Sequence, residues 1–467
     1  MTVQQMSDIE QNFGAAKCKR LKVITQCLLP ILMWSLQGLN GGAQAADLLD
    51  VYHLARERDP TYEAGYYALQ AVQEKLPQAR ASLLPQVSAN ATRSLTHGLY
   101  SFGTASESDR NLIASGWAVQ LTQPLVRVQY GETYRQAEFV VEQAKAQFAL
   151  VEQDLILRTA QAYFDFDVAR ESLRVADARV VAMAQQLKLN KNGFAAGIND
   201  LTDVYEAQAR LDLAHSQSVA VRNDLEFKSA ELEKIIGTLP LTLNALSAEA
   251  QLSFPEPNLV QHWVTQASND SLSVRLQRAA VGVAEKEVAK NQATHLPTLD
   301  LTASYGRNYS SGSTTLQDYN SRSRAAQIGL QMNVPLYAGG LVNSKVREAT
   351  GRFYQAKAEL EIAERLASTN ARQAFAGVNN ERARVQALGS EIASRRHAVK
   401  GNQIGLKLGT RTNIDVLNAE QQLYTSQRDW VKARYDVLLQ GLKLKAAAGR
   451  LTETDVLNVN SMFTVIH

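Results

Sequence analysis

Two short segments of this 467-residue chain combine glycine with polar and charged side chains that could cap helices and pair charges. The residues concerned are Gly197, Asp200, Thr202 and Asp203 in the first segment and Gly409, Arg411, Thr412 and Asp415 in the second. A glycine tolerates the left-handed backbone that ends a helix. Asp200 or Thr412 can then cap the following helix, with an aspartate three residues later at the third helical position. The pattern predicts two helical hairpins, and only the second tip contains a basic residue, Arg411.

The other reactive residue types indicate no enzyme. The seven histidines are scattered without an H-E-x-x-H pair, and the chain has neither G-x-S-x-G nor a phosphate loop ending in G-K-S/T. Both cysteines, Cys18 and Cys27, lie in an N-terminal segment that we expect to be removed, so the mature chain has no disulfide or thiolate site. The formal charge of +3 is too small to indicate a basic surface for binding nucleic acid. We therefore expect no catalytic residue, cofactor, metal or nucleic-acid partner.

The first 45 residues have the pattern of a secretory signal peptide. Four basic residues precede a mostly apolar run from Val23 to Trp34, and the segment closes on Ala43-Gln44-Ala45. The alternative is an uncleaved anchor, but the run is shorter than the roughly 20 residues of a membrane-spanning helix. We predict a signal peptide at 1–45 and an exported mature chain that begins at Ala46.

The elements that position the two turns are long helices. No proline occurs between Pro124 and Pro240 or after Pro335, and proline is the strongest breaker of helix interiors. Apolar residues recur every three or four positions in the first of these tracts, which defines one stripe of a helix. At about 1.5 Å per residue, a helix from Gly131 to Ala195 is roughly 100 Å long.

Four segments before these tracts alternate apolar and polar residues. They are 85–97, 114–126, 296–308 and 325–337. Period-two alternation over about ten residues is typical of outer-membrane barrel strands, although an antiparallel sheet with one wet face gives the same pattern. Trp117 and Tyr337, near strand ends, fit either an aromatic belt or core packing. Four strands cannot close a barrel, so the chain must oligomerise, with eight strands from two chains or twelve from three.

The two halves of the chain match at an offset of 212 residues. Asp203-Val204 corresponds to Asp415-Val416, and Gly237 corresponds to Gly449. We therefore predict two repeats, 46–255 and 256–467, each with a helix, two strands and a long helical hairpin.

These features resemble the TolC family. The second turn and the helix after it, Gly409 to Glu420, read GTRTNIDVLNAE, as in the family's second helix–turn motif. The start of the mature chain, Ala46 to Gln86, is similar to the family's N-terminus. The resemblance covers essentially the whole mature chain. It implies a mostly α-helical homotrimer with a 12-stranded barrel in the outer membrane, continued by a long periplasmic α-helical barrel.

The resemblance also implies a function. Family members are passive exit ducts of tripartite systems, working with a periplasmic membrane-fusion adaptor and an inner-membrane ABC or proton-driven transporter. The segment Leu76 to Ala81 and the chain length resemble the type I protein secretion branch slightly more than the multidrug efflux branch. The alternative is a non-channel periplasmic coiled-coil adaptor or structural protein, which the alternating strands disfavour.

In this family the two turns close the periplasmic end of the duct. The resemblance implies that Arg411 bonds Thr202 and Asp203 of a neighbouring first turn, as a latch. It also implies that Asp415 points into the pore as an acidic ring. The family's second pore aspartate, about one turn further on, is Asn418 here, and a tyrosine before the turn glycine is Leu406. These departures predict a ring with half of the charge and a lock with fewer links.

Overall fold

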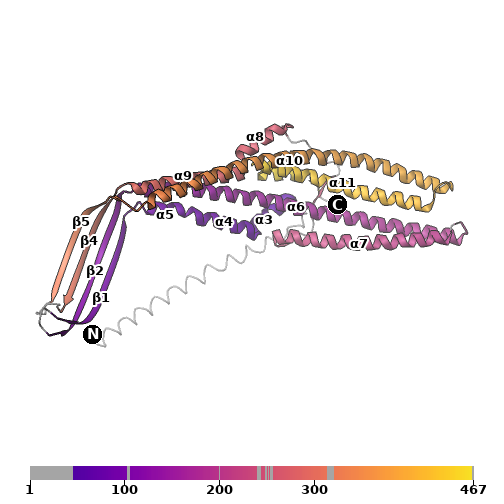
Figure 1. The fold of residues 1–467 in the computed structure, drawn as a ribbon. Helices are drawn as coiled ribbons and strands as arrows, with labels where there is room; N and C mark the ends of the chain where they lie inside the picture. Colours follow the sequence, from indigo (N-terminus) through magenta and orange to yellow (C-terminus); the bar gives the residue numbers. More distant parts are fainter. Residues whose placement is uncertain are drawn as a thin grey trace, which may run out of the picture.

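The computed structural model describes residues 46–101, 106–198, 200–238, 243–247, 250, 252, 256–312 and 320–464. The predicted signal peptide at 1–45 lies outside the described residues. The described chain is long and mostly helical, with one sheet at one end and two helical turns at the other (Figure 1).

Two long helical hairpins form the body of the molecule. The first pairs α6 (Val128–Ala195) with α7 (Leu201–Ile236), and the second pairs α10 (Leu341–Lys407) with α11 (Asn413–Ala447). Each hairpin has a glycine with positive φ at its turn, 68° at Gly197 and 71° at Gly409. Residues other than glycine rarely adopt this backbone conformation. α6 has 68 residues, so at about 1.5 Å per residue it extends for roughly 100 Å.

Shorter helices lie along the half of α6 and α10 nearer the sheet (Figure 1). In chain order they are α3 (Leu48–Arg58), α4 (Pro60–Gln73), α5 (Lys75–Ala81), α8 (Val260–Asp270), α9 (Leu272–Gln292) and the 3₁₀ turn η1 (Ala293–His295). A further short helix near the C-terminus, α12 (Glu453–Asn460), contacts α3. Asp59 caps α4 by accepting from the Tyr62 amide at 3.1 Å, and Pro60 occupies the first helical position, where its missing N–H costs nothing. α9 packs between α6 and α10, and thereby joins the two halves of the chain.

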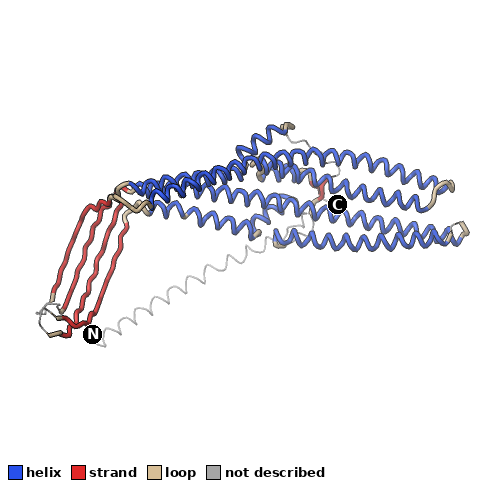
Figure 2. The backbone as a smooth tube through the Cα atoms, viewed as in Figure 1, coloured by secondary structure: helices blue, strands red, loops and turns tan. Residues whose placement is uncertain are grey.

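Four antiparallel strands form the sheet, in the order β1 (Gln86–Tyr100), β2 (Ser108–Val126), β4 (Thr298–Ser311) and β5 (Ser321–Asn333) (Figure 2). β5 ends at Asn333, whereas the sequence pattern extended the strand to 337. Pro335 offers no backbone N–H to continue the ladder. Within the described chain, β1 and β5 each have a neighbour on one side only.

The two faces of the sheet differ in chemistry because cross-strand partners share a face. One face carries Val87, Leu121, Ala303 and Ile328 in one row across the strands, followed by Ala89, Val119, Tyr305 and Ala326 in the next. The opposite face carries small and polar residues, among them Ser88, Gln120, Ser304 and Gln327. Ile328 and Leu330 are 75% and 66% exposed, so a single chain leaves the apolar face uncovered.

An ion pair helps to fix the sheet to the helical body. Arg127, between β2 and α6, donates to both carboxylate oxygens of Asp300 on β4, at 2.9 and 2.6 Å. Such a two-point contact fixes orientation as well as distance.

Across the described residues, no helix combines the length and hydropathy needed to span a bilayer.

The main hydrophobic core lies around the middle of α6. It joins α3, α6, α7, α11 and α12 with the two-stranded sheet of β3 (Ala245–Leu246) and β6 (Phe463–Thr464). Phe164 is 2% exposed, and its ring stacks on Phe463 with centroids 6.1 Å apart. The sequence pattern did not indicate α12 and β6, because they are short and belong to neither repeat motif.

Candidate functional site: the helical turns

Both turns lie at the end of the molecule that is farthest from the sheet (Figure 1). The first connects α6 to α7 and the second connects α10 to α11. In each, an amide beyond the glycine closes the helix end: Ile198 donates to the Gly193 carbonyl at 2.8 Å, and Thr410 donates to the Gly405 carbonyl at 2.9 Å. The turns therefore share one backbone design.

The second turn satisfies its own polar groups. The Thr412 hydroxyl accepts from the Asp415 amide at 3.3 Å, and the Thr412 amide donates to the Asp415 carboxylate at 2.9 Å. This reciprocal pair is the capping box that the sequence predicts. The hydrogen bond from the Thr412 amide, with a second from its hydroxyl, holds the pKa of the Asp415 carboxyl below its usual range. Asp415 is therefore charged at neutral pH.

The first turn has a weaker cap. Asp200 occupies the N-cap position of α7, but its side chain makes no capping hydrogen bond, so the expected side-chain cap is absent. The Asp203 amide bonds instead to the Asp200 carbonyl at 3.1 Å. The carboxylates of Asp200 and Asp203 are thus not used in the cap of their own helix, in contrast to Asp415.

The predicted latch residues lie on different turns. Thr202 and Arg411 are both exposed, and no hydrogen bond or ion pair joins Arg411 to Thr202 or Asp203 within the described chain. The Arg411 side chain folds back against the end of α10, because a Cβ placed at Gly405 would meet the Arg411 Cγ at 2.6 Å. Asn418, one turn beyond Asp415, is exposed. One chain therefore presents these groups without pairing them.

A hydrogen-bonded chain that the sequence analysis did not anticipate connects the two hairpins near the turns. The Asn190 side chain donates to the Asp203 carbonyl at 3.1 Å, and Gln186 donates to Asn190 at 3.2 Å. Gln186 also donates to Asn413, which is 5% exposed, at 2.7 Å. The signal was present in the repeat: Asn402, 212 residues after Asn190, makes the corresponding contact with the Asp415 carbonyl at 3.4 Å.

A second polar network lies in the central core. Asp167 on α6 is fully buried and accepts hydrogen bonds from Arg170 and from the Tyr435 hydroxyl on α11. The Tyr435 oxygen in turn accepts from the Leu246 amide of β3 at 3.1 Å. Burial raises the pKa of the Asp167 carboxyl to about 7, and the charge of Arg170 opposes this rise. The network ties both hairpins to the small sheet.

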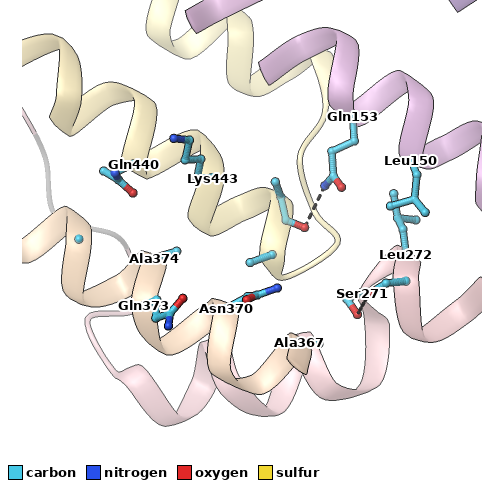
Figure 3. A pocket seen from close by; sticks show the side chains of 14 residues that line it. Leu150, Gln153, Ser271, Leu272, Ala367, Asn370, Gln373, Ala374, Gln440 and Lys443 are labelled. Carbon is cyan, nitrogen blue, oxygen red and sulfur yellow. Dashed lines mark hydrogen bonds between the residues drawn. The ribbon is translucent and has the colours of Figure 1, made fainter. Parts of the chain in front are cut away.

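A cavity of about 550 Å³ lies between α6, α10, α11 and the start of α9 (Figure 3). Its lining contains amide and small side chains and two leucines, and Lys443 is its charged group. Gln153, which also lines the cavity, donates to the Ala446 carbonyl at 2.9 Å. It contains no carboxylate, histidine or cysteine. No cluster of three or more potential metal ligands occurs among the described residues.

Comparison with known proteins agrees with this architecture. The family described as "Outer membrane efflux protein" matches residues 51–238 and 263–450. The outer membrane protein TolC of Salmonella enteritidis is 32% identical over 439 residues, which cover 93% of this chain and 88% of that protein. The proteases secretion protein PrtF of Dickeya chrysanthemi is 30% identical over 447 residues, covering 93% and 95%.

The fold also has a close counterpart among solved structures. The crystal structure of CusC superposes with a TM-score of 0.75 at 16% identity, and the match covers 88% of this chain and 95% of CusC. Because both halves match one family and the identity to TolC extends over nearly the whole chain, this protein belongs to the outer membrane efflux protein family.

Proposed function

We propose that this protein is the outer-membrane exit duct of a tripartite transport system, with a periplasmic end that opens and closes. Residence in the outer membrane, with a long helical portion in the periplasm, follows from the family, as does passive transport without catalysis. The alternative, a non-channel coiled-coil adaptor, does not fit this family. Residues 1–45 are proposed to direct export and then to be removed.

One observation carries the proposal: a sheet with an exposed apolar face lies at one end of helical hairpins about 100 Å long. An apolar face with a polar reverse suits a wall between lipid and water. Its unpaired edges, β1 and β5, cannot remain open in lipid, where each unsatisfied backbone group costs several kcal/mol. We infer that three chains join these edges into a 12-stranded barrel, and that their hairpins form the α-helical barrel below it.

The two turns are proposed to form the gate. Arg411 of one hairpin would pair with Thr202 and Asp203 of a neighbouring first turn, and Asp415 with Asn418 would lie at the pore. The support is chemical: the Asp203 carboxylate makes no capping hydrogen bond to its own helix, and Arg411 is exposed. Asp415 is already engaged by Thr412, so its ring would be rigid as well as charged.

The partners are proposed from the relatives. PrtF is named for secretion of proteases, and TolC is named as an outer membrane protein. We propose a periplasmic membrane-fusion adaptor and an inner-membrane ABC or proton-driven transporter as partners, with type I protein secretion favoured over multidrug efflux.

Extraction of outer membranes tests the duct. The protein should migrate as a trimer on a gel without heating and as a monomer after boiling, and purified trimers should conduct ions across a planar bilayer. A monomer soluble without detergent, or a trimer with no conductance under any condition, would contradict the proposal.

A further inference from the structure

The apolar face of the sheet changes character toward the end farthest from the helices. Next to the row of Ala89, Val119, Tyr305 and Ala326, the register places Ala91, Trp117, Arg307 and Arg324 side by side. The following row contains Arg93, Ser115, Tyr309 and Arg322. Four arginines on three strands therefore occupy two adjacent rows, on the same face as the apolar rows nearer the helices. We call these four residues the arginine rim.

The described residues give the arginine rim no carboxylate partner. All four side chains are exposed, and no ion pair joins any of them to a carboxylate within the described part of the chain. Arg307 and Arg324 are direct cross-strand partners, an arrangement of like charges that is unfavourable unless an anion lies between or beside them. Arg322 stacks over the ring of Tyr309, with the guanidinium 5.6 Å from the ring centre.

The depth of the arginine rim follows from strand geometry. Met332 and Arg324 are eight residues apart on β5 (332 − 324 = 8), about 27 Å along a strand at roughly 3.4 Å per residue. With a strand tilt of about 40°, this is roughly 20 Å along the membrane normal, close to the height of a barrel's apolar band. Arginine is strongly disfavoured at the bilayer centre and nearly neutral at its edge.

The aromatic residues at this level agree with an interfacial depth. Trp117 and Tyr305 lie edge to face with ring centres 5.7 Å apart, beside Arg307. Tryptophan and tyrosine gather where hydrocarbon meets headgroups. Because the helices extend into the periplasm, the arginine rim lies at the outer leaflet, away from them.

We propose that the arginine rim is a binding surface for the phosphate groups of outer-leaflet glycolipid. This inference rests on the proposed orientation of the sheet in the outer membrane. A planar guanidinium matches phosphate with two parallel hydrogen bonds. Bound phosphates would neutralise the Arg307–Arg324 pair and hold a shell of lipid around the duct.

Reconstitution of the full-length mature protein tests the inference. Vesicles of phosphatidylcholine alone are compared with vesicles that also contain bisphosphorylated lipid A, and the temperature at which the oligomer dissociates is measured on gels. Lipid A should raise this temperature for the wild type. Each arginine replaced by glutamine should raise the lipid A content needed for half of this temperature increase roughly fivefold, and the Arg93, Arg307, Arg322 and Arg324 fourfold variant should lose the increase.

Arg110→Gln is the matched control. Arg110 is on β2 of the same sheet, and its pairing with Gly98 puts its side chain on the same polar face as Ser88 and Gln120. It should respond to lipid A as the wild type does. An equal response of the fourfold variant would overturn the inference, as would an equal effect of millimolar inorganic phosphate without lipid A. If the wild type inserts into neither vesicle, the duct proposal itself fails, and the inference fails with it.

Discussion

The middle of the molecule buries and pairs its own side chains, whereas its two ends leave theirs exposed. Around Asp167 a single chain completes its own core, with Phe164 at 2% exposure and the buried carboxylate bonded to Arg170 and Tyr435. At the sheet end, Ile328 is 75% exposed, and at the turn end Arg411 is exposed. The middle can therefore be stable within one chain, whereas both ends leave groups exposed that another chain or lipid can contact.

This difference assigns different roles to the middle of the molecule and to its ends. The middle holds the two hairpins together through α11, α6 and the β3–β6 pair, which fixes the helices on which both ends depend. The ends carry the interactions with the surroundings, apolar at the sheet and charged at the turns. Substitutions in the middle should change the stability of the chain itself, and substitutions at the ends should change assembly or gating.

Removal of a central ring should have the largest effect. Phe164→Ala deletes a buried ring that contacts Tyr435 and Phe463, and such deletions cost about 3–5 kcal/mol. Thermal unfolding followed by helical circular dichroism measures the loss. Phe227→Ala is the control, because Phe227 is 60% exposed and its loss should cost about 0.5 kcal/mol or less. Equal losses in the two variants would mean that the middle is not the stabilising region.

A charge on the sheet face should prevent assembly without unfolding the helices. Ile328→Arg places a charge on the apolar face midway between Met332 and Arg324, at about 2–4 kcal/mol per chain near the bilayer centre. The yield of trimers in outer membranes should fall strongly. Gln327→Arg is the matched control one residue away, on the polar face, and should assemble normally. A normal yield from Ile328→Arg together with a low yield from Gln327→Arg would show that the faces are reversed.

The buried carboxylate should make stability depend on pH. The pKa of Asp167 is raised to about 7, above its unfolded value of about 3.9, so the folded state binds more protons between these pH values. The contribution of Asp167 to the free energy of unfolding is therefore greatest at low pH. It is lost as the pH rises toward 7, at up to about 1.4 kcal/mol per pH unit. Asp167→Asn should flatten the stability profile between pH 5 and 7, and Asp212→Asn, an exposed control, should leave it unchanged. Parallel profiles for wild type and Asp167→Asn would contradict this assignment.

The sequence predicted the parts of the fold that depend on local patterns. Proline-free tracts and turn glycines indicated the hairpins, and Thr412 with Asp415 indicated a capping box that the structure contains. It did not indicate the Asp167–Tyr435 contact, because those residues are 268 positions apart and neither belongs to a short motif. The same limit explains Asp200, whose side chain has the right type for a cap but is not used as one. Residue type sets what a group can do, and distant packing decides which partner it has.

The smallest expected effect concerns the turn end, where Arg411→Ala should loosen the proposed gate. An exposed ion pair is worth about 0.2–1 kcal/mol, so three pairs per trimer give roughly 0.6–3 kcal/mol. At about 1.4 kcal/mol per tenfold change in population, the open fraction should rise about 3- to 150-fold. Single-channel conductance of purified trimers in planar bilayers measures this fraction. Because the pairing is electrostatic, the wild type should also open more often as salt increases, and the variant should respond less.

Lys407→Ala is the control that separates a latch from a general change in charge. Lys407 is exposed on the last turn of α10, four residues before Arg411, and has no ion pair within the described chain. Its removal subtracts the same charge from the same end without removing the proposed contact. Gly405→Ala adds a second perturbation, because the new Cβ would push the Arg411 side chain from its place while leaving the charge intact. If Arg411→Ala and Lys407→Ala raise the open fraction equally, Arg411 acts only through its charge, and the contact that closes the duct lies elsewhere on the turns.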